Sequence, residues 1–427
     1  MTKYAEILKD ELVKALGCTE PIAVALLASR FADAIEEEPT EIKLRCSGNI
    51  IKNVKSVLVP NTGGLKGLEV ATLAGVVSKN WQAELEVLNN LSEDDIKKIK
   101  TLLKKDIVKT EHLDTPAVLH IQIEGRSKNN TAFAELIHTH TNIVKLIKNG
   151  KVIFEKPFDV NEVKLPGIDR SCLNVKDILN FADKVKIDEV SEVIKNQIDT
   201  NMKIANEGFD LLNEKSITKV LLKNACKTQG VDINNISTIT KARVKLASAI
   251  ETRMLGFNYP VVANSGSGTQ GLCVSIPVII FAREAGVSEE KMIRALLVSN
   301  LLANHQKTGI GKLSAFCGAV SATTAAMAAV AYMFGYGYKG VSKTMENSLA
   351  TIAGMVCDGA KVSCAAKAIV ALGASHFAYE MAINDIAFSE GEGVVKDNIE
   401  NTISAVGVLA NKGMKETDKV LLNIILE

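Results

Sequence analysis

The chain has 427 residues, of which 47% are hydrophobic and 23% are charged, so it is long enough for two packed domains and lacks the polar bias of a disordered protein. Lys and Arg total 50 and Asp and Glu total 49, and the resulting net charge of +1 argues against nucleic acid or an anionic membrane as a partner. The first residues show no basic and then apolar signal region, so we expect a cytoplasmic protein. In that reducing compartment, the eight cysteines are expected to be metal ligands, catalytic thiols or buried small side chains rather than disulfides.

The first 36 residues predict two helices, because apolar residues recur at helical spacing over residues 4–16 and 21–36. The break between them contains Cys18, with Thr19 as the candidate N-cap of the second helix and Pro21 in its first turn. Backbone N–H groups and the positive end of that helix would then lie near the Cys18 thiol. This environment favours a thiolate.

From residue 41 the pattern becomes mixed, and beyond residue 166 it predicts helices alone. The mixed part has expected strands at 42–46, 54–59, 117–124 and 151–154 and expected helices at 68–78 and 92–105. The later helices are expected at 175–184, 189–212, 239–255, 271–285, 289–303, 315–334 and 341–356, with a closing pair from residue 373. We therefore expect an α+β fold, in which a mainly helical catalytic domain (1–36 plus 166–427) carries an inserted α+β domain (37–165). The first two helices are expected to pack against the helical half.

One segment, residues 313–338, carries no formal charge and exceeds the roughly 20 residues that a bilayer-spanning helix needs. It is dominated by Ala, Ser, Thr and Gly, which gain little from hydrocarbon but allow backbones to approach closely. We interpret it as a helix buried within the helical half rather than as a membrane span.

Three cysteines in the helical half, Cys317, Cys357 and Cys364, are candidate cluster ligands, because iron-sulfur clusters take thiolate ligands. On a straight helix, Cys357 and Cys364 would share one face but lie about 10 Å apart along the axis. We therefore expect a turn or helix break at Asp358 and Gly359. Burial as small hydrophobic side chains is the alternative, and the spacing by itself favours that alternative.

Two runs rich in glycine and polar groups are candidate ligand-binding segments: Asn61, Thr62 and Gly63, and Ser265, Gly266, Ser267 and Gly268. The second run precedes a predicted helix, and its backbone N–H groups could bind an anion such as a substrate carboxylate. The first run follows a predicted strand and offers amide, hydroxyl and backbone donors. Ordinary turns are the alternative for both.

Several other polar residues allow two interpretations. His138 and His140 alternate in a β-rich run, so they are either a metal-binding pair or, as we expect, surface strand residues. Lys361 and Lys367 flank Cys364 and could offset the charge of a thiolate-ligated cluster or transfer a proton. Most lysines in such positions point to solvent.

The chain resembles the L-cysteine desulfidase family, whose helical half is similar to the alpha chain of iron-sulfur L-serine dehydratases. The resemblance spans essentially the whole chain, and its motifs are residues 17–21 (GCTEP), 59–63 (VPNTG), 265–271 (SGSGTQG), 310–318 (IGKLSAFCG) and 357–361 (CDGAK) with Cys364. The family's three cluster ligands map onto Cys317, Cys357 and Cys364, and its additional functional cysteine maps onto Cys18. The resemblance implies a [4Fe-4S] cluster with one iron free of protein ligands, and no pyridoxal phosphate.

The resemblance also implies β-elimination of L-cysteine to hydrogen sulfide, ammonia and pyruvate, with the open iron as the Lewis acid. Cys18 is the expected base for the Cα proton, with Glu20 or Lys361 as alternatives, and Thr19 joins the two polar runs as a substrate-binding candidate. L-serine dehydration is the nearest alternative reaction. A non-catalytic iron-sulfur sensor is another alternative, although the sequence shows no nucleic-acid-binding motif for its output. The Ala-rich helical half is compatible with a homodimer.

Overall fold

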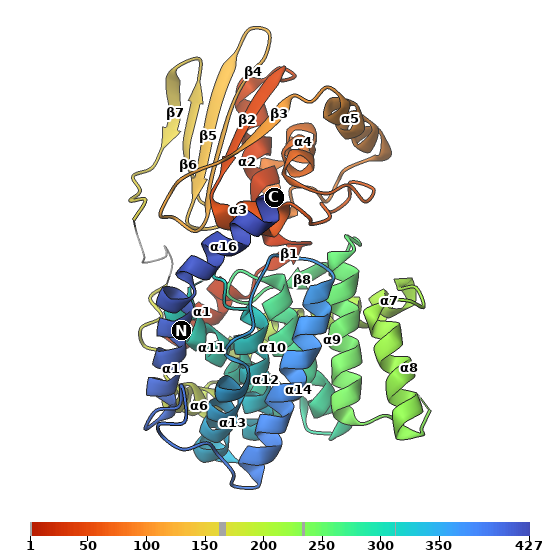
Figure 1. Cartoon of the computed structure of the whole chain (residues 1–427), viewed down its shortest axis with the longest axis vertical. Coiled ribbons are helices and arrows are strands. Elements are labelled where there is room, and N and C mark those ends of the chain that lie inside the picture. Colours follow the sequence, from red (N-terminus) through yellow and green to blue (C-terminus); the bar gives the residue numbers. More distant parts are fainter. Residues whose placement is uncertain (1, 162–167, 233–234, 312) are drawn as a thin grey trace.

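The computed structural model describes residues 2–161, 168–232, 235–311 and 313–427, and it consists of a sheet-containing part and a helical part (Figure 1). The fold is α+β and mainly helical, which confirms the expected fold class. The expected boundary of the insertion at residues 165 and 166 lies outside the described residues.

The sheet has the strand order β3-β2-β4-β5-β6-β7, and its neighbouring strands are antiparallel except for the parallel pair β2 and β3. Buried residues alternate along β2 at Ile42, Leu44 and Cys46, as expected for a strand with one face on a core. The strands are β2 (Glu41–Cys46), β3 (Val108–His112), β4 (His120–Arg126), β5 (Thr131–Ile137), β6 (Ile143–Lys148) and β7 (Lys151–Glu155). The helices around them are α2 (Thr19–Ile35), α3 (Gly48–Val54), α4 (Leu68–Ser78), η1 (Trp81–Glu86) and α5 (Glu93–Lys104).

Helix α2 packs on the sheet and on α4, and the expectation that it packs against the helical half is wrong. Its buried residues, such as Ile22 and Phe31, belong to the same hydrophobic cluster as Ile42 and Leu44 of the sheet. This helix is apolar on nearly every side, so its periodicity does not identify the partner against which it packs.

The helical part is built around α12 (Gly318–Met333), which α10, α11, α13 and α14 surround. Every residue of α12 except Gly318 and Tyr332 is buried, so the uncharged stretch is a core helix as expected. Within the described ranges, no helix has the length and apolar character needed to cross a membrane. The other helices are α1 (Lys3–Glu11), α6 (Val175–Lys184), η2 (Ile187–Glu189), α7 (Ser191–Leu211), α8 (Ile217–Gln229), α9 (Thr238–Met254), α10 (Gly268–Glu284), α11 (Glu289–Ile310), α13 (Gly337–Ile352), α14 (Ser363–Ile383), α15 (Ile399–Val408), the π-helical turn η3 (Leu409–Gly413) and α16 (Lys415–Leu426).

Two connections hold the parts together. Helix α16 runs from the helical part back to the sheet part, where Asp418 forms an ion pair with Lys52 of α3 (Figure 1). Strand β1 (Lys14–Leu16), which follows α1, pairs antiparallel with β8 (Pro260–Val262). The site described below lies where these two parts meet.

Some of the expected elements are wrong, and some of the observed elements were not predicted. The expected helix 4–16 ends at Glu11 and is followed by β1, and β8 is a strand beyond residue 166. The expected strand 54–59 is instead the end of α3 followed by a single bridge between Leu58 and Lys66. The elements that were not predicted include α3, η1, α8, β3, β5 and β6. Short apolar runs do not distinguish helix from strand, and β1 depends on a partner that is remote in the sequence.

Candidate functional site

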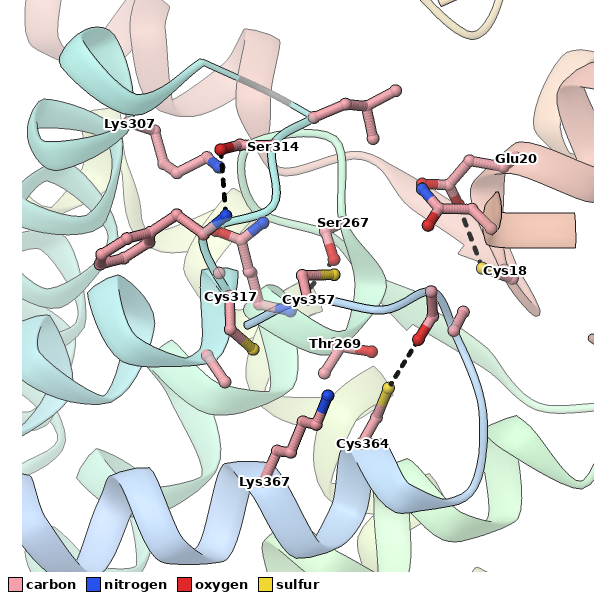
Figure 2. A pocket seen from close by; sticks show the side chains of 18 of the residues that line it. Cys18, Glu20, Ser267, Thr269, Lys307, Ser314, Cys317, Cys357, Cys364 and Lys367 are labelled. Atoms are coloured by element: carbon pink, nitrogen blue, oxygen red, sulfur yellow. Dashed lines mark hydrogen bonds between the residues drawn. The ribbon is translucent and has the colours of Figure 1, made fainter. Parts of the chain in front are cut away.

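The three expected cluster cysteines and Cys18 line a single pocket of about 100 Å³ between the two parts of the molecule (Figure 2). Cys18, Glu20 and Asn53 reach it from the sheet part, and its other lining residues come from the helical part. The lining side chains that can ionise or form hydrogen bonds include Cys18, Glu20, Asn53, Arg253, Ser267, Thr269, Gln270, Lys307, Ser314, Cys317, Cys357, Cys364 and Lys367. Residues far apart in sequence thus meet at one polar site.

A short backbone bridge sets Cys317 and Cys357 side by side. The N–H of Cys317 donates to the carbonyl of Met355 at 3.0 Å, and the N–H of Cys357 donates to the carbonyl of Ala315 at 2.7 Å. Cys317 is also the N-cap residue of α12, so its backbone is fixed from both sides. Both thiols therefore face the pocket from adjacent, paired segments.

Cys364 comes to the same pocket because the chain turns between it and Cys357, which confirms the expected break at Asp358 and Gly359. Helix α13 has ended at Ile352, and Cys364 lies in the first turn of α14. Gly359 has φ +98°, and a Cβ atom there would lie 2.4 Å from the backbone carbonyl oxygen of Lys52. Only glycine combines this backbone conformation with so close an approach to α3.

The donor set fits an iron-sulfur cluster better than a single metal ion. No three His, Cys, Asp or Glu side chains in the described part of the chain are grouped closely enough to hold one ion. A cluster places its own iron and sulfide atoms between its thiolate ligands, so it suits thiols that converge from separate segments. Burial, with the neighbouring Cys357 as a further cause, raises the pKa of Cys317 to about 12. Coordination would therefore release the thiol protons, as metal binding by cysteine requires.

Cys18 and Glu20 form a buried thiol–carboxylate pair that lines the same pocket as these three thiols (Figure 2). Cys18 Sγ donates to Glu20 Oε2 at 3.1 Å, and Asn53 Nδ2 donates to Glu20 Oε1 at 3.2 Å. Cys18, rather than Thr19, is the N-cap residue of α2. The Thr19 hydroxyl does not line the pocket but lies 3.2 Å from Glu20 Oε2 and 3.1 Å from the carbonyl oxygen of Gly266.

The expectation that Cys18 is a thiolate is wrong for this structure. Burial and the adjacent Glu20 raise the pKa of Cys18 well above its usual value, and they outweigh the nearby positive charge of Arg253. Burial opposes the ionisation of Glu20, but His140 and the Cys18 hydrogen bond hold its pKa below the usual 4.5. The pair is therefore an ionised carboxylate that accepts a hydrogen bond from a neutral thiol.

His140 is a neighbour of this pair that the sequence did not indicate. Both His138 and His140 were expected on the surface, and both are buried. His138 lies 2.8 Å from the carbonyl oxygen of Asp159 through Nε2. His140 interacts electrostatically with the Glu20 carboxylate and lowers its pKa.

The two polar runs are placed differently. Ser267 lines the pocket and caps α10, and its Oγ accepts from the N–H of Gln270 at 3.4 Å. Ser265, Gly266 and Gly268 lie beside it without lining the pocket. Asn61, Thr62 and Gly63 also do not line it, because this run is bonded within its own part. Asn61 Nδ2 donates to the carbonyl of Leu88 at 3.0 Å, and Thr62 Oγ1 donates to that of Val59 at 2.7 Å.

The two lysines near Cys364 also differ. Lys361 does not line the pocket, and its Nζ lies 2.8 Å from Asp358 Oδ1 in an ion pair. Lys367 lines the pocket, pairs with the same carboxylate and donates to the carbonyl of Val356 at 2.9 Å. Lys367 is thus placed beside the thiols, and its charge lowers the pKa of Cys317 and Cys364, as that of Lys361 does for Cys364.

Sequence reasoning did not identify Asn53, Arg253 or Gln270 as pocket residues. Arg253 lies in the last turn of α9, where a basic residue is common for reasons of helix capping. No local pattern distinguishes it from an ordinary C-terminal arginine. Its place in the pocket becomes visible only when α9, α10 and the Gly17 turn are brought together.

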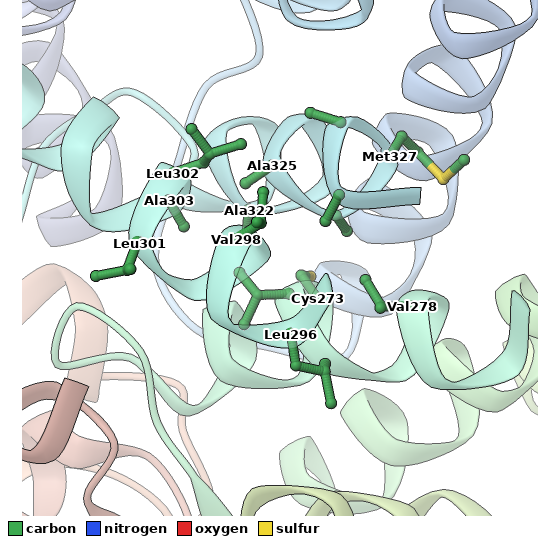
Figure 3. Packing of buried hydrophobic residues seen from close by; sticks show 14 of the residues in the cluster. Cys273, Val278, Leu296, Val298, Leu301, Leu302, Ala303, Ala322, Ala325 and Met327 are labelled. Atoms are coloured by element: carbon green, nitrogen blue, oxygen red, sulfur yellow. The ribbon is translucent and has the colours of Figure 1, made fainter. Parts of the chain in front are cut away.

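Cys273 is close to the site but belongs to the core. It lies on α10 among apolar residues of α11 and α12, including Val298 and Ala322 (Figure 3). Burial raises the pKa of its thiol, and Cys317 and Cys364 contribute further. It does not line the pocket.

Together, the helical core and the pocket of ionisable groups and thiols have the features of an enzyme active site, where buried titratable side chains gather in a cleft. Residues 82–423 match the family model described as serine dehydratase alpha chain, and the chain belongs to this family of iron-sulfur-dependent lyases. This confirms the expected relationship to iron-sulfur serine dehydratases.

Bacterial relatives match over essentially the whole chain. A UPF0597 protein of Treponema denticola is 50% identical over 425 residues, which cover 100% of this chain and 98% of the relative. A UPF0597 protein of Lachnoclostridium phytofermentans is 42% identical over 424 residues, covering 99% of both chains. One of Finegoldia magna is 42% identical over 428 residues, covering 100% of both. The similarity therefore includes the sheet part as well as the helical part.

Proposed function

We propose that this chain is a lyase that converts L-cysteine and water to hydrogen sulfide, ammonia and pyruvate, with a [4Fe-4S] cluster held by Cys317, Cys357 and Cys364. The observation that carries the proposal is the convergence of these three thiols with the Cys18–Glu20 pair on one pocket. Membership of a lyase family supports elimination from a small β-substituted amino acid. The GCTEP motif at residues 17–21 and the sheet part support the desulfidase rather than the dehydratase reaction.

Cys317, Cys357 and Cys364 would hold the cluster, and an iron without a protein ligand would supply a Lewis acid for the departing β-substituent. Lys367 and the backbone bridge between Cys317 and Cys357 hold the ligand segments in place. The chain's other contribution is to remove the Cα proton.

The Cys18–Glu20 pair is the proposed base. Glu20 takes the proton of the Cys18 thiol along their 3.1 Å hydrogen bond as Cys18 Sγ takes the Cα proton of the substrate. The electron pair of the Cα–H bond forms the Cα–Cβ double bond as the Cβ–S bond breaks and sulfide leaves. The aminoacrylate product tautomerises to an imine, and water hydrolyses it to pyruvate and ammonia. Lys361 is not needed as a base, because its amine is held by Asp358.

L-serine is the second candidate substrate, and the observation that favours it is the description of the matched family as serine dehydratase alpha chain. The same proton transfer would apply, and the β-hydroxyl would leave as water. A soft thiolate suits iron well and leaves more readily than hydroxide, which favours L-cysteine.

The test is anaerobic reconstitution with iron and sulfide, followed by assays of sulfide and pyruvate from L-cysteine and of pyruvate from L-serine. Wild type is compared with Cys357→Ala and with Cys226→Ala, a matched control on α8 that lies outside the pocket. We expect sulfide and pyruvate in equal amounts from L-cysteine, retained in Cys226→Ala and lost in Cys357→Ala. Faster pyruvate release from L-serine would identify the dehydratase. A loaded cluster without turnover of either amino acid would refute the lyase proposal.

A further inference from the structure

Arg253 is a buried cation that lines the pocket, where its positive charge acts at a distance on Glu20 and Cys18. Arg253 is 4% exposed, and no described Asp or Glu side chain forms a direct ion pair with it. Five other arginines in the described ranges form direct ion pairs with carboxylates: Arg30, Arg45, Arg126, Arg170 and Arg294. A buried charge is most stable when it is closely paired, and Glu20 is not in direct contact with Arg253, so Arg253 is placed to pair directly with an anion that enters the pocket.

The guanidinium of Arg253 is held in a fixed orientation. Its Nε donates to the carbonyl of Gly17 at 2.9 Å, and its Nη1 donates to Thr269 Oγ1 at 2.9 Å. A Cβ atom on Gly268 would lie 2.8 Å from Nε, so glycine at this position leaves room for the guanidinium to lie against the first turn of α10. These two bonds use two of the five N–H groups of an arginine. The other N–H groups of the guanidinium remain available to a ligand.

The surroundings favour a substrate carboxylate over the cluster as that anion. Lys367, which is bonded to the backbone just before Cys357, is the cation attached to the ligand segments. Arg253 is attached instead to the turn that carries Cys18 and to the start of α10. The first-turn N–H groups and positive dipole of α10 add to its attraction for an anion. A planar guanidinium also matches the two oxygens of a carboxylate.

We propose that Arg253 binds the α-carboxylate of the amino acid substrate and thereby orients the Cα–H bond toward the Cys18–Glu20 pair. The inference rests on the proposed function, because it assigns a residue to the substrate of that same site. It also explains the SGSGT run, in which Gly268 makes room for Arg253 and Thr269 orients it.

The test compares two ligands that have no β leaving group. L-Alanine carries a negatively charged carboxylate, and L-alaninamide carries a neutral carboxamide in its place. Their dissociation constants are measured by calorimetry on anaerobically loaded wild type, Arg253→Gln and Arg253→Lys, and iron content and thermal unfolding are measured on each. Arg243→Gln, on the same helix α9 but outside the pocket, is the matched control. Because no turnover is needed, the result is independent of the assays of sulfide and pyruvate that test the proposed function.

We expect wild type and Arg243→Gln to prefer L-alanine by about 10- to 100-fold, the range for hydrogen bonds to a charged group. Arg253→Gln should bind the two ligands within about threefold of each other while retaining its iron, and Arg253→Lys should retain part of the preference. The inference is overturned if wild type shows no preference, or if Arg253→Gln keeps the full preference. It is also overturned if both Arg253 variants fold but lose their iron, since the anion would then be the cluster.

Discussion

Replacing Glu20 by glutamine tests the proposed base most directly, because this substitution keeps the shape of the side chain and removes its charge. Glu20 Oε2 accepts from Cys18 Sγ at 3.1 Å, and Oε1 accepts from Asn53 Nδ2 at 3.2 Å. A glutamine has one acceptor oxygen, so either orientation of its amide directs an NH2 group at one of these donors. The variant can no longer take a proton from Cys18.

The expected magnitudes follow from these contacts. One buried donor left without an acceptor costs about 1–3 kcal/mol of stability. Loss of a positioned base lowers kcat by about 100- to 10,000-fold. We therefore expect Glu20→Gln to unfold at a somewhat lower temperature, to load its cluster normally, and to lose nearly all release of pyruvate.

Glu251→Gln is the matched control for stability. Glu251 is 3% exposed and accepts from the backbone N–H groups of Ile217 and Thr218, both at 3.0 Å, but it lies outside the pocket. It should lose comparable stability and keep wild-type kcat. Anaerobic steady-state assays of pyruvate and calorimetric unfolding of both variants make the comparison. The reasoning is refuted if Glu20→Gln retains kcat within about threefold of wild type, or if Glu251→Gln loses as much.

Three further predictions concern the same site. Cys18→Ser should keep its iron but lose turnover by about 100-fold or more, because a hydroxyl is far less acidic than a thiol and gives its proton to Glu20 much less readily; turnover near the wild-type rate would remove Cys18 from the base. Gly359→Ala should destabilise the fold by at least about 1–2 kcal/mol in thermal unfolding, and iron analysis should show weaker loading, because φ is +98° and the new Cβ meets the backbone of α3. Equal stability and loading would contradict this. The pKa of Glu20 lies below its usual 4.5, so its stabilising contribution is present above that pH and is lost as the pH falls through the lowered pKa. The unfolding temperature of wild type should therefore fall more steeply than that of Glu20→Gln on acidification below about pH 4.5, and parallel curves would argue against an ionised Glu20.

Local signals predicted helices in both parts. Helices α4 (Leu68–Ser78) and α6 (Val175–Lys184) have the predicted bounds, because their ends coincide with changes in periodicity, and Asn174 caps α6. The buried character of α12 was also predictable, since no charge interrupts it. The break between Cys357 and Cys364 followed from the axial rise of a helix and from the glycine between the two cysteines.

The types of the main elements, the candidate thiols and the need for a turn at Gly359 could be predicted from local sequence, since these depend on neighbouring residues. The packing of α2 on the sheet, the charge on Glu20 rather than Cys18, and the place of Arg253 in the pocket emerge from the folded chain. Each of these depends on burial and on partners remote in sequence. Desolvation by the surrounding fold outweighs the local effect of a helix end on the Cys18 thiol, and no local pattern contains that information.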